Sequence, residues 1–430
     1  MKSTAVYKGL FYLLLVLSLT GEVLFAQNTN PTAADKHAEG METNHIRVPN
    51  VLFSGVLLRN QEKNQTWYFP NVFEWFPANT VEGFVVNPQV KFTQHYNDGR
   101  FVSITPNVRY GFGNERLQAQ LKIQHFYSPS KNAVLSLSGG RAMEQLYNES
   151  TLSALNNILY TFAYDQNFLK LYERSYVEVG HAFSPLKNFL LSTRVSWNER
   201  SPLTNLASFE EERIYTANNP TNIELSNAAF TEHQAVILEA ELRWQIGHRL
   251  TKRRGQLVSE GEYPALTISY VNATDVILNG DVSYQKLSIG VQDEYKMGSA
   301  YGKWFVEAGD FLTKDQLTFV DFNHFKGRET VYGPYGNDQF QLLAYYTNST
   351  ADFYVQAHYE HHFSPLRKSG KSQIQPVAGI HYLYTDAGGH YVELGAGVDA
   401  ILKFWRVDFY SSWREGKHES IGVRLGVTIE

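Results

Sequence analysis

The 430-residue chain contains no cysteine and only 4 methionines. Without cysteine it forms no disulfide and carries no lipoprotein anchor, so its stability must come from backbone hydrogen bonds and packing. It also lacks a strong excess of either charge, because 38 Lys and Arg stand against 43 Asp and Glu, for a net charge of -5. That balance excludes a strongly basic nucleic-acid binder.

Long apolar runs are scarce as well. Only the stretch near residue 9 approaches the roughly 20 residues that a helix needs to cross a bilayer, and the mean hydropathy is -0.33. A protein with several membrane-spanning helices is therefore excluded. Aromatic residues, in contrast, are abundant, with 27 Tyr, 27 Phe and 7 Trp. An aromatic-rich, cysteine-free composition is typical of a membrane β-barrel.

The N-terminus has the pattern of a secretory signal peptide. Lys2 and Lys8 precede the apolar residues 9–19, and the pattern ends at Ala26. We predict cleavage after Ala26, which makes residues 1–26 a signal peptide; the alternative is an uncleaved membrane anchor. Residues 27–50 are polar and aperiodic, and we expect a disordered periplasmic tail there.

From residue 51 onward, apolar and polar residues alternate with a period of two. The alternation is clearest in residues 117–124, 188–197, 236–246 and 421–429. The third of these ranges fits a tilted membrane strand of about 9 to 11 residues. We predict an all-β fold, a transmembrane antiparallel β-barrel over residues 51–430 with long extracellular loops. A soluble β-sandwich is the alternative.

Three of the predicted strands end in nearly the same way, at Ser128-Pro129, Ser184-Pro185 and Ser364-Pro365. Because proline has no N–H to donate to a ladder, each Ser-Pro should begin a tight turn, which we assign to the periplasmic side. The long polar connections are then extracellular, since such barrels keep short turns inside and long loops outside. These connections are residues 143–169, 199–234 and 314–351.

The same parity predicts the number of strands. The first strand is residues 51–58 or 66–75, the second is residues 81–96, and a count along the chain gives sixteen in all. An even number returns the C-terminus to the periplasm. If residues 340–346 form a strand with a partner near 317–322, the number becomes eighteen.

Short motifs in the expected order give a resemblance to a known family. They are residues 79–84, Tyr263-Pro264, and residues 306–309, 359–363 and 391–397. Residues 51–430 resemble the C-terminal barrel of a Gram-negative outer-membrane family of unassigned function, whose longer members carry a carboxypeptidase-like regulatory domain. The resemblance implies the fold and no activity.

A more distant similarity is to the BamA and TamA superfamily of outer-membrane insertases and translocases. It rests on the sixteen strands and on a long loop ahead of the last five. In that superfamily the loop folds into the lumen, and an Arg beside a Gly pairs with an acidic residue of the wall. Gly327-Arg328 stands in the corresponding segment, so the resemblance implies a lumenal plug around Arg328; the alternative is an ordinary loop arginine. The acidic strand motif and the periplasmic polypeptide-binding domains of that superfamily are not evident here.

Charged residues of both signs are expected on the inward face of several strands. We expect them to cross-link the barrel wall by ion pairs, and a wide-open polar pore is the alternative. The set consists of Arg194, Glu239, Glu241, Arg243, Glu393, Asp399, Arg406, Asp408 and Arg424.

No constellation points to an enzyme or a metal site. His358, Glu360 and His362 share one strand face, but residues four apart on a strand lie about 13 Å apart, too far for one zinc ion. A site made by His358 and Glu360 with a ligand from a neighbouring strand stays open. The Ser and His pairs repeat at three turns, as a turn signal does and a nucleophile need not. We therefore expect no catalytic residue, no metal and no cofactor.

We predict a non-enzymatic role in translocation or assembly, with the seam between the first and last strands as the working surface. Gly422 and Gly426 on the last strand are expected to weaken pairing there. A passive pore or structural protein is one alternative, and a barrel lipase or protease is another. The expected partners are outer-membrane lipid and lipopolysaccharide, with other envelope proteins as further candidates and no nucleic acid.

Overall fold

The computed structural model describes residues 51, 54–147, 149, 152, 154–205, 215–246, 249–253, 256–260, 264–336, 338–369, 372–401 and 405–427. The predicted signal peptide, residues 1–26, and the predicted tail, residues 27–50, lie outside the described residues. Among the described residues, no helix is both long enough and apolar enough to cross a membrane.

One antiparallel sheet of 20 strands dominates the fold, which confirms the all-β antiparallel prediction. Short pieces are numbered separately within this sheet. Its strands are β1 (Val56–Asn60), β2 (Gln65–Phe69), β3 (Ala78–Asn79), β4 (Gly83–Val86), β5 (Lys91–His95), β6 (Phe101–Gly111), β7 (Arg116–Ser128), β8 (Ala133–Gln145), β9 (Leu171–Phe183), β10 (Phe189–Pro202), β11 (His233–Gln245), β14 (Ala265–Thr274), β15 (Ser283–Met297), β16 (Ala300–Gln316), β17 (Tyr354–His362), β18 (Arg367–Ser369), β19 (Ser372–Thr385), β20 (Gly389–Ile401), β21 (Trp405–Arg414) and β22 (Lys417–Val427).

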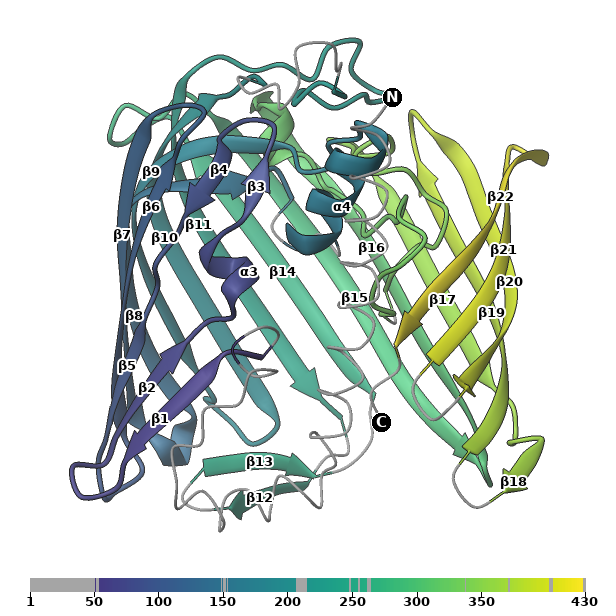
Figure 1. Cartoon of the computed structure of the whole chain (residues 1–430), viewed down its shortest axis with the longest axis horizontal. Coiled ribbons are helices and arrows are strands. Elements are labelled where there is room, and N and C mark those ends of the chain that lie inside the picture. The colour runs from purple at the N-terminus through teal and green to yellow at the C-terminus, as the bar shows by residue number, and fades with distance from the viewer. Residues whose placement is uncertain are drawn as a thin grey trace, which may run out of the picture.

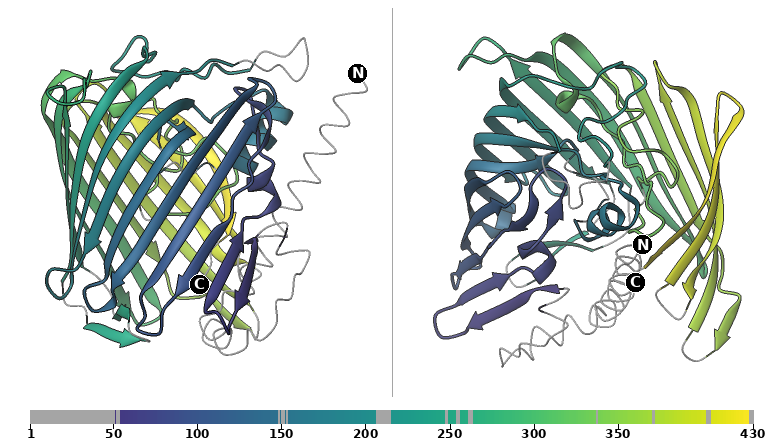
Figure 2. Two further views of the ribbon diagram at one scale, coloured as in Figure 1. Left: turned by 90° about the vertical axis from the view of Figure 1, so that its left-hand side faces the viewer. Right: turned by 45° about the horizontal axis from the view of Figure 1, so that its top comes forward.

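The strands follow one another around a curved wall (Figure 1). The pairing runs β1–β2–β5–β6 and continues through each next long strand to β11, then through β14, β15, β16, β17 and β19 to β22. Strands β1 and β22 are the two edges of the wall, and within the described residues no ladder joins them (Figure 2).

The apolar side chains of the strands point outward from the wall, and the polar ones point inward. On β7, Leu117 is 66% exposed and Leu121 is 44% exposed, whereas Gln118 between them is 2% exposed. Successive side chains of a strand point to opposite faces, so a period of two separates an apolar outer face from a polar inner one. A soluble sheet has the reverse arrangement, with its apolar face toward the core.

The N-terminal part of the wall differs in detail from the sequence prediction. Both segments proposed for the first strand form strands, as the hairpin of β1 and β2. The predicted strand over residues 81–96 is split into β4 and β5, which both pair with β6. The break falls at Pro88, which lacks an N–H and restricts the residue before it. The number of sixteen strands is therefore not confirmed.

The two ends of the wall carry different connections. The three Ser-Pro segments lie at the end that Figure 1 draws at the bottom, where β12 (Arg249–Arg253) and β13 (Gln256–Glu260) form an additional hairpin. After β7, the short helix η2 (Pro129–Lys131) makes the turn, and Asn132 follows it with a φ of 54°. The long connections lie at the opposite end, as the parity of the strands predicted.

Two of these long connections contain structure that the sequence analysis missed. The first, predicted as a polar loop over residues 143–169, contains the helix α4 (Ala154–Tyr164), which lies against β3. Outside these connections, a short helix, α3 (Val72–Trp75), lies between β2 and β3 and is capped by the Asn71 side chain. The connection after β16 contains the short helix η3 (Phe319–Asp321).

Candidate functional site

The connection between β16 and β17, residues 317–353, is folded inside the wall, and we call it the inner segment. Its Phe340 and Leu343 are 0% and 2% exposed, and they pack in one cluster with Tyr354, Leu383 and Tyr391 of the wall. Residues 340–346 form no strand, so the eighteen-strand alternative is wrong at this point. The inner segment therefore fills part of the interior with apolar contacts.

One end of the inner segment is fixed by a buried ion pair. Arg200 of β10 donates a hydrogen bond of 2.6 Å from Nη1 to Oδ1 of Asp321 in η3. Tyr284 donates to the same oxygen at 3.3 Å, and Thr318 donates to the other carboxylate oxygen. Burial alone would raise the pKa of Asp321, but Arg200 and these donors keep that pKa below its usual value. The carboxylate therefore stays charged and holds η3 on the wall.

Glu393 of β20 fixes the middle of the inner segment. Its side chain is fully buried and accepts three backbone N–H groups: Oε2 from Gln341 at 2.6 Å, and Oε1 from Leu342 and Leu343 at 2.8 Å each. The hydroxyl of Tyr391 donates to Oε1 at 2.7 Å. Hydrogen bonds to a buried carboxylate are stronger than neutral ones. Since these N–H groups bind Glu393, they are not available for the strand ladder that the eighteen-strand alternative required.

Arg328, the predicted plug residue, is 1% exposed and lies between the inner segment and β22. Its guanidinium donates to the carbonyl oxygens of Thr330, Val331 and Leu425 and to the side chain of Gln341, and it lies 5.0 Å from the ring centre of Tyr335. These partners differ from the acidic wall residue that the distant resemblance implied. Arg328 thus connects the inner segment directly to the backbone of the last strand.

Gly327 permits the turn that precedes Arg328. A Cβ atom at this position would collide with the carbonyl oxygen of Leu343, while the N–H of Arg328 donates to that same oxygen at 2.9 Å. The close approach of two backbone segments requires a residue without a side chain. The Gly-Arg pair singled out in the sequence is therefore explained by packing within the inner segment.

Arg424 of β22, another member of the predicted charged wall, also binds the inner segment. It donates to the carbonyl oxygens of Gln341 at 2.5 Å and of Arg328 at 3.2 Å. The neighbouring glycines of β22, which were expected to weaken pairing at the seam, also lie close to the inner segment. A Cβ at Gly422 would lie 2.8 Å from Leu342, and one at Gly426 would lie 2.5 Å from the carbonyl oxygen of Gly333. They give the inner segment room against β22.

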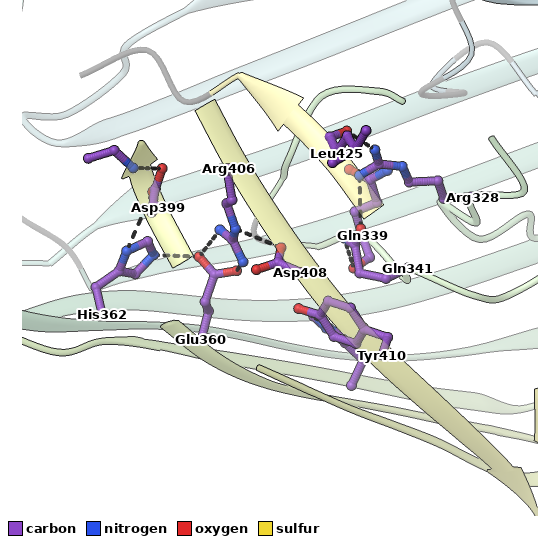
Figure 3. A network of polar contacts seen from close by, with 12 residues as sticks. Arg328, Gln339, Gln341, Glu360, His362, Asp399, Arg406, Asp408, Tyr410 and Leu425 are labelled. Carbon is purple, nitrogen blue, oxygen red and sulfur yellow. Dashed lines mark hydrogen bonds and ion pairs between the residues drawn. The ribbon is translucent and has the colours of Figure 1, made fainter. Parts of the chain in front are cut away.

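Arg406, Asp408 and Asp399 of the predicted set belong to a second cluster beside the first (Figure 3). Arg406 binds Glu360 with two hydrogen bonds, of 2.9 and 2.5 Å, and Asp408 with one of 2.7 Å. The Tyr335 ring lies 4.1 Å from this guanidinium. Because Tyr335 also faces Arg328, its ring is held between two arginines, one from the wall and one from the inner segment.

Asp399 reaches this cluster through a histidine. His362 lies 2.5 Å from Glu360 and 3.8 Å from Asp399, with its ring stacked on Tyr301. His358 instead contacts His381, with 3.0 Å between their Nδ1 atoms. Within the triplet, Glu360 and His362 therefore contact each other, while His358 pairs with His381. The described residues contain no group of three or more His, Cys, Asp or Glu side chains arranged to hold a metal ion.

The remaining members of the charged set lie on the other half of the wall. Arg194 of β10 pairs with Glu239 of β11 at 3.0 Å and with Glu178 of β9 at 3.7 Å. Arg194 and Glu239 are half-exposed. Glu241 and Arg243 follow Glu239 on the same face of β11. Of the predicted set, Arg194, Glu239, Arg406 and Asp408 form ion pairs within the wall, and Glu393 and Arg424 bind the inner segment.

The inner segment also occupies the edge of the last strand. The N–H of Leu425 donates to the carbonyl oxygen of Val331 at 2.8 Å, and the N–H of Gly333 donates to the carbonyl oxygen of Leu425 at 3.2 Å. The two pieces run parallel, with Tyr332 opposite Leu425. Strand β21 pairs with one edge of β22. Residues 331–333 pair with the other edge, which is the edge that would meet β1 in a closed wall. We call residues 331–333 the resident strand.

Helix α4 supports the resident strand from the opposite side. The N–H of Val331 donates to the hydroxyl of Tyr160 at 2.8 Å, and Asn156 donates to the carbonyl oxygen of Tyr332 at 3.2 Å. The ring of Phe162 on α4 lies 6.4 Å from that of Phe84 on β4. Contacts therefore continue from β4 through α4 and the resident strand to β22.

Several residues of this site were not found from the sequence. Tyr335 lies in a stretch without periodicity, so no local pattern marks it, and Gln341 lies in residues 340–346, where the alternative strand did not form. Helix α4 did have a signal, because Leu155, Ile158, Leu159 and Phe162 follow the three-and-four spacing of an amphipathic helix. The polar composition of the surrounding connection concealed this pattern.

Comparison with known proteins gives one family. The model described as "Family of unknown function (DUF5686) C-terminal domain" matches residues 49–398. This match confirms the resemblance to a family of unassigned function. A search of curated proteins gave no match.

Three solved structures with a similar arrangement are distant in sequence. BamA from Haemophilus ducreyi lacking POTRA domains 1–3 is 11% identical, with 84% of this chain and 70% of that chain covered and a TM-score of 0.43. CdiB from Acinetobacter baumannii is 9% identical, with 81% and 56% covered and a TM-score of 0.38. A triple mutant of the Rhodopseudomonas blastica porin is 10% identical, with 80% and 90% covered and a TM-score of 0.32. At these scores the similarities carry no functional argument.

Proposed function

The chain belongs to the DUF5686 C-terminal domain family, and we propose that it is an outer-membrane β-barrel with a non-enzymatic role in the translocation or assembly of polypeptides. The working surface is the seam between β1 and β22, and the inner segment is the lumenal plug. Export through a signal peptide cleaved after Ala26 brings the chain to the membrane. Lipid and lipopolysaccharide surround the wall, and other envelope proteins are the candidate clients.

The outer face of the wall supports a membrane location. Large apolar side chains are exposed on strands all around the sheet, including Leu135, Val177, Val195, Ile289, Leu394 and Phe409. A soluble protein rarely exposes apolar surface on this scale. In a bilayer the same side chains face lipid, and the ladder satisfies the backbone polar groups.

The observation that carries the proposal is the state of the seam. In the described residues no ladder joins β1 to β22, and the edge of β22 around Leu425 pairs with the resident strand. An edge held by three residues and a few side chains opens at a smaller free-energy cost than a full antiparallel ladder. A passive pore is the second candidate function, and it is favoured by the half-exposed Arg194 and Glu239 on the opposite wall.

Photo-crosslinking in the native host tests the translocation or assembly role. A photoreactive amino acid replaces Ile421 on β22, which is 59% exposed, and the control replaces Ile289 on β15, which is 46% exposed. Both sites are apolar and outward, and only the first is on the seam strand. We expect adducts with newly exported polypeptides at position 421 alone. Equal adducts at both positions, or none at position 421, would contradict the role.

Single-channel conductance of the purified protein separates a plugged barrel from a passive pore. We expect the wild type to be closed in planar bilayers and a deletion of residues 320–336 to conduct. A large, steady conductance of the wild type would refute the plug and favour the pore. Heat modifiability on gels shows whether the deletion variant has folded.

A further inference from the structure

The backbone of Leu425 shows how the edge of β22 binds another chain. Its N–H and its carbonyl oxygen both point to the resident strand and make hydrogen bonds of 2.8 and 3.2 Å with Val331 and Gly333. The same carbonyl also accepts from the Arg328 guanidinium. Two backbone hydrogen bonds to one residue are the contact by which an extended peptide adds to a sheet edge. The edge therefore recognises backbone, not a particular side chain.

The surface beside this edge is shaped for close approach. Gly426 has no side chain, and a Cβ there would lie 2.5 Å from the carbonyl oxygen of Gly333. In the resident strand, Tyr332 is buried while Val331 is 44% exposed. An occupant of this edge must therefore be extended and must offer free backbone groups, and its backbone carbonyl lies close to Gly426.

The resident strand pairs with β22 over a short stretch, centred on Leu425. Besides Leu425, groups that hold its backbone include the Tyr160 hydroxyl and the Asn156 amide on α4, the Arg328 guanidinium and the Thr330 hydroxyl. In addition, the residue after Gly333 is Pro334, which has no N–H and cannot extend the ladder. A longer strand without this proline is able to make more hydrogen bonds with the same edge.

We propose that the edge of β22 around Leu425 is a binding site for an extended polypeptide segment, and that the resident strand is a displaceable internal occupant of this site. The segment binds parallel to β22, as the resident strand does. This inference rests on the proposed function, because it names the strand and the atoms by which a client is held. It also assigns α4 a role, since movement of α4 removes two of the groups that hold the resident strand.

A peptide that copies the chain's own sequence is the direct probe. The peptide comprises residues 328–336 with a fluorophore, and the control peptide carries N-methylglycine at the position of Gly333, which replaces the N–H donor to Leu425 by an N-methyl group. The proteins are the full chain, its Gly333→Pro variant and its Gly333→Ala variant. Both variants add a Cβ that meets the Arg328 side chain at 3.3 Å, but only proline removes the N–H.

We expect the peptide to bind the Gly333→Pro variant at least tenfold more tightly than the wild type, whose site is occupied, with the Gly333→Ala variant close to the wild type. The N-methylated peptide should lose at least tenfold in affinity for the Gly333→Pro variant. Adding Tyr160→Phe, which removes the acceptor for the Val331 N–H, should increase the binding further. If the N-methylated peptide binds as well as its parent, or if no variant binds either peptide, the inference is wrong.

The two proposals fail separately. The peptide assay needs no client, so peptide binding without adducts at position 421 would leave the strand site and refute translocation or assembly. Adducts at position 421 without peptide binding would keep that role and refute the strand site. A peptide that binds the wild type as well as the Gly333→Pro variant would show that the resident strand does not occupy the site in solution.

Discussion

Replacing Glu393 by glutamine tests how the inner segment is held. The carboxylate accepts the N–H groups of Gln341, Leu342 and Leu343 on its two oxygens, in a fully buried position. A glutamine side chain has nearly the same shape but replaces one acceptor by an NH2 group. The best orientation of this glutamine places its carbonyl oxygen at the Oε1 position. The N–H of Gln341 then faces the glutamine NH2 group, which is a donor.

The cost follows from these contacts. A buried donor without a partner costs about 1 to 3 kcal/mol, and the other two bonds lose their charge assistance, so we expect a total of about 2 to 4 kcal/mol. Every 1.4 kcal/mol is about a factor of ten in an equilibrium constant. The local opening of residues 341–343 should therefore become about 30-fold to several hundred-fold more frequent in the Glu393→Gln variant.

Hydrogen exchange measured by mass spectrometry on the purified protein follows this opening directly. We expect faster exchange in peptides covering residues 341–343 and unchanged exchange in the wall strands. Glu239→Gln is the matched control, because Glu239 is a half-exposed carboxylate that pairs within the wall. Unchanged exchange at residues 341–343 in the Glu393→Gln variant, or an equal increase in the control, would refute the reasoning.

Three further predictions concern other contacts of the inner segment. Arg200 keeps the pKa of Asp321 below its unfolded value, so the stability contributed by this ion pair is present above the unfolded pKa of about 3.9 and is lost as pH falls through the folded pKa. In thermal scans, Asp321→Asn should lower the unfolding temperature at pH 7, and the difference from the wild type should shrink as the pH is lowered below the unfolded pKa. Gly426→Ala places a Cβ 2.5 Å from the Gly333 carbonyl and should open the plug to conductance, whereas Gly290→Ala, with its nearest contact at 3.5 Å, should not. Burial lowers the pKa of His324 to about 3, so its ring signals in NMR should not shift between pH 5 and 8; a midpoint near 6.5 would contradict this burial.

The wall could be predicted from the sequence because its signal is local. A period of two fixes which side chains of a strand point outward, and it does so within each strand regardless of its neighbours. Leu117, Gln118 and Leu121 follow this rule on β7. The Ser-Pro turns are local as well, since the missing N–H of proline acts on its own ladder. The errors in the wall, at Pro88 and in the β1–β2 hairpin, concern where a strand breaks, which depends on a few residues only.

The site was predictable only in its composition. The charged set contains Glu393, Arg406 and Arg424, and all three are buried, but alternation shows only that they face inward and not which groups they meet. Glu393 binds the backbone N–H of Leu342, 51 positions away, and Arg424 binds the carbonyl oxygen of Gln341, 83 positions away. Backbone groups are the same in every residue, so no residue type in the sequence marks these partners.

By itself, the sequence determined the class of fold, the apolar outer face, the ends of most strands and the separation of short turns from long connections, because each of these depends on residues close together in the chain. Only the tertiary structure decided that residues 317–353 fold into the interior, that Arg328 meets the last strand instead of an acidic residue, and that Val331 and Gly333 bind Leu425 at the seam. Those contacts join segments almost a hundred residues apart through backbone hydrogen bonds. They form only after the curved wall has brought β22 beside the inner segment.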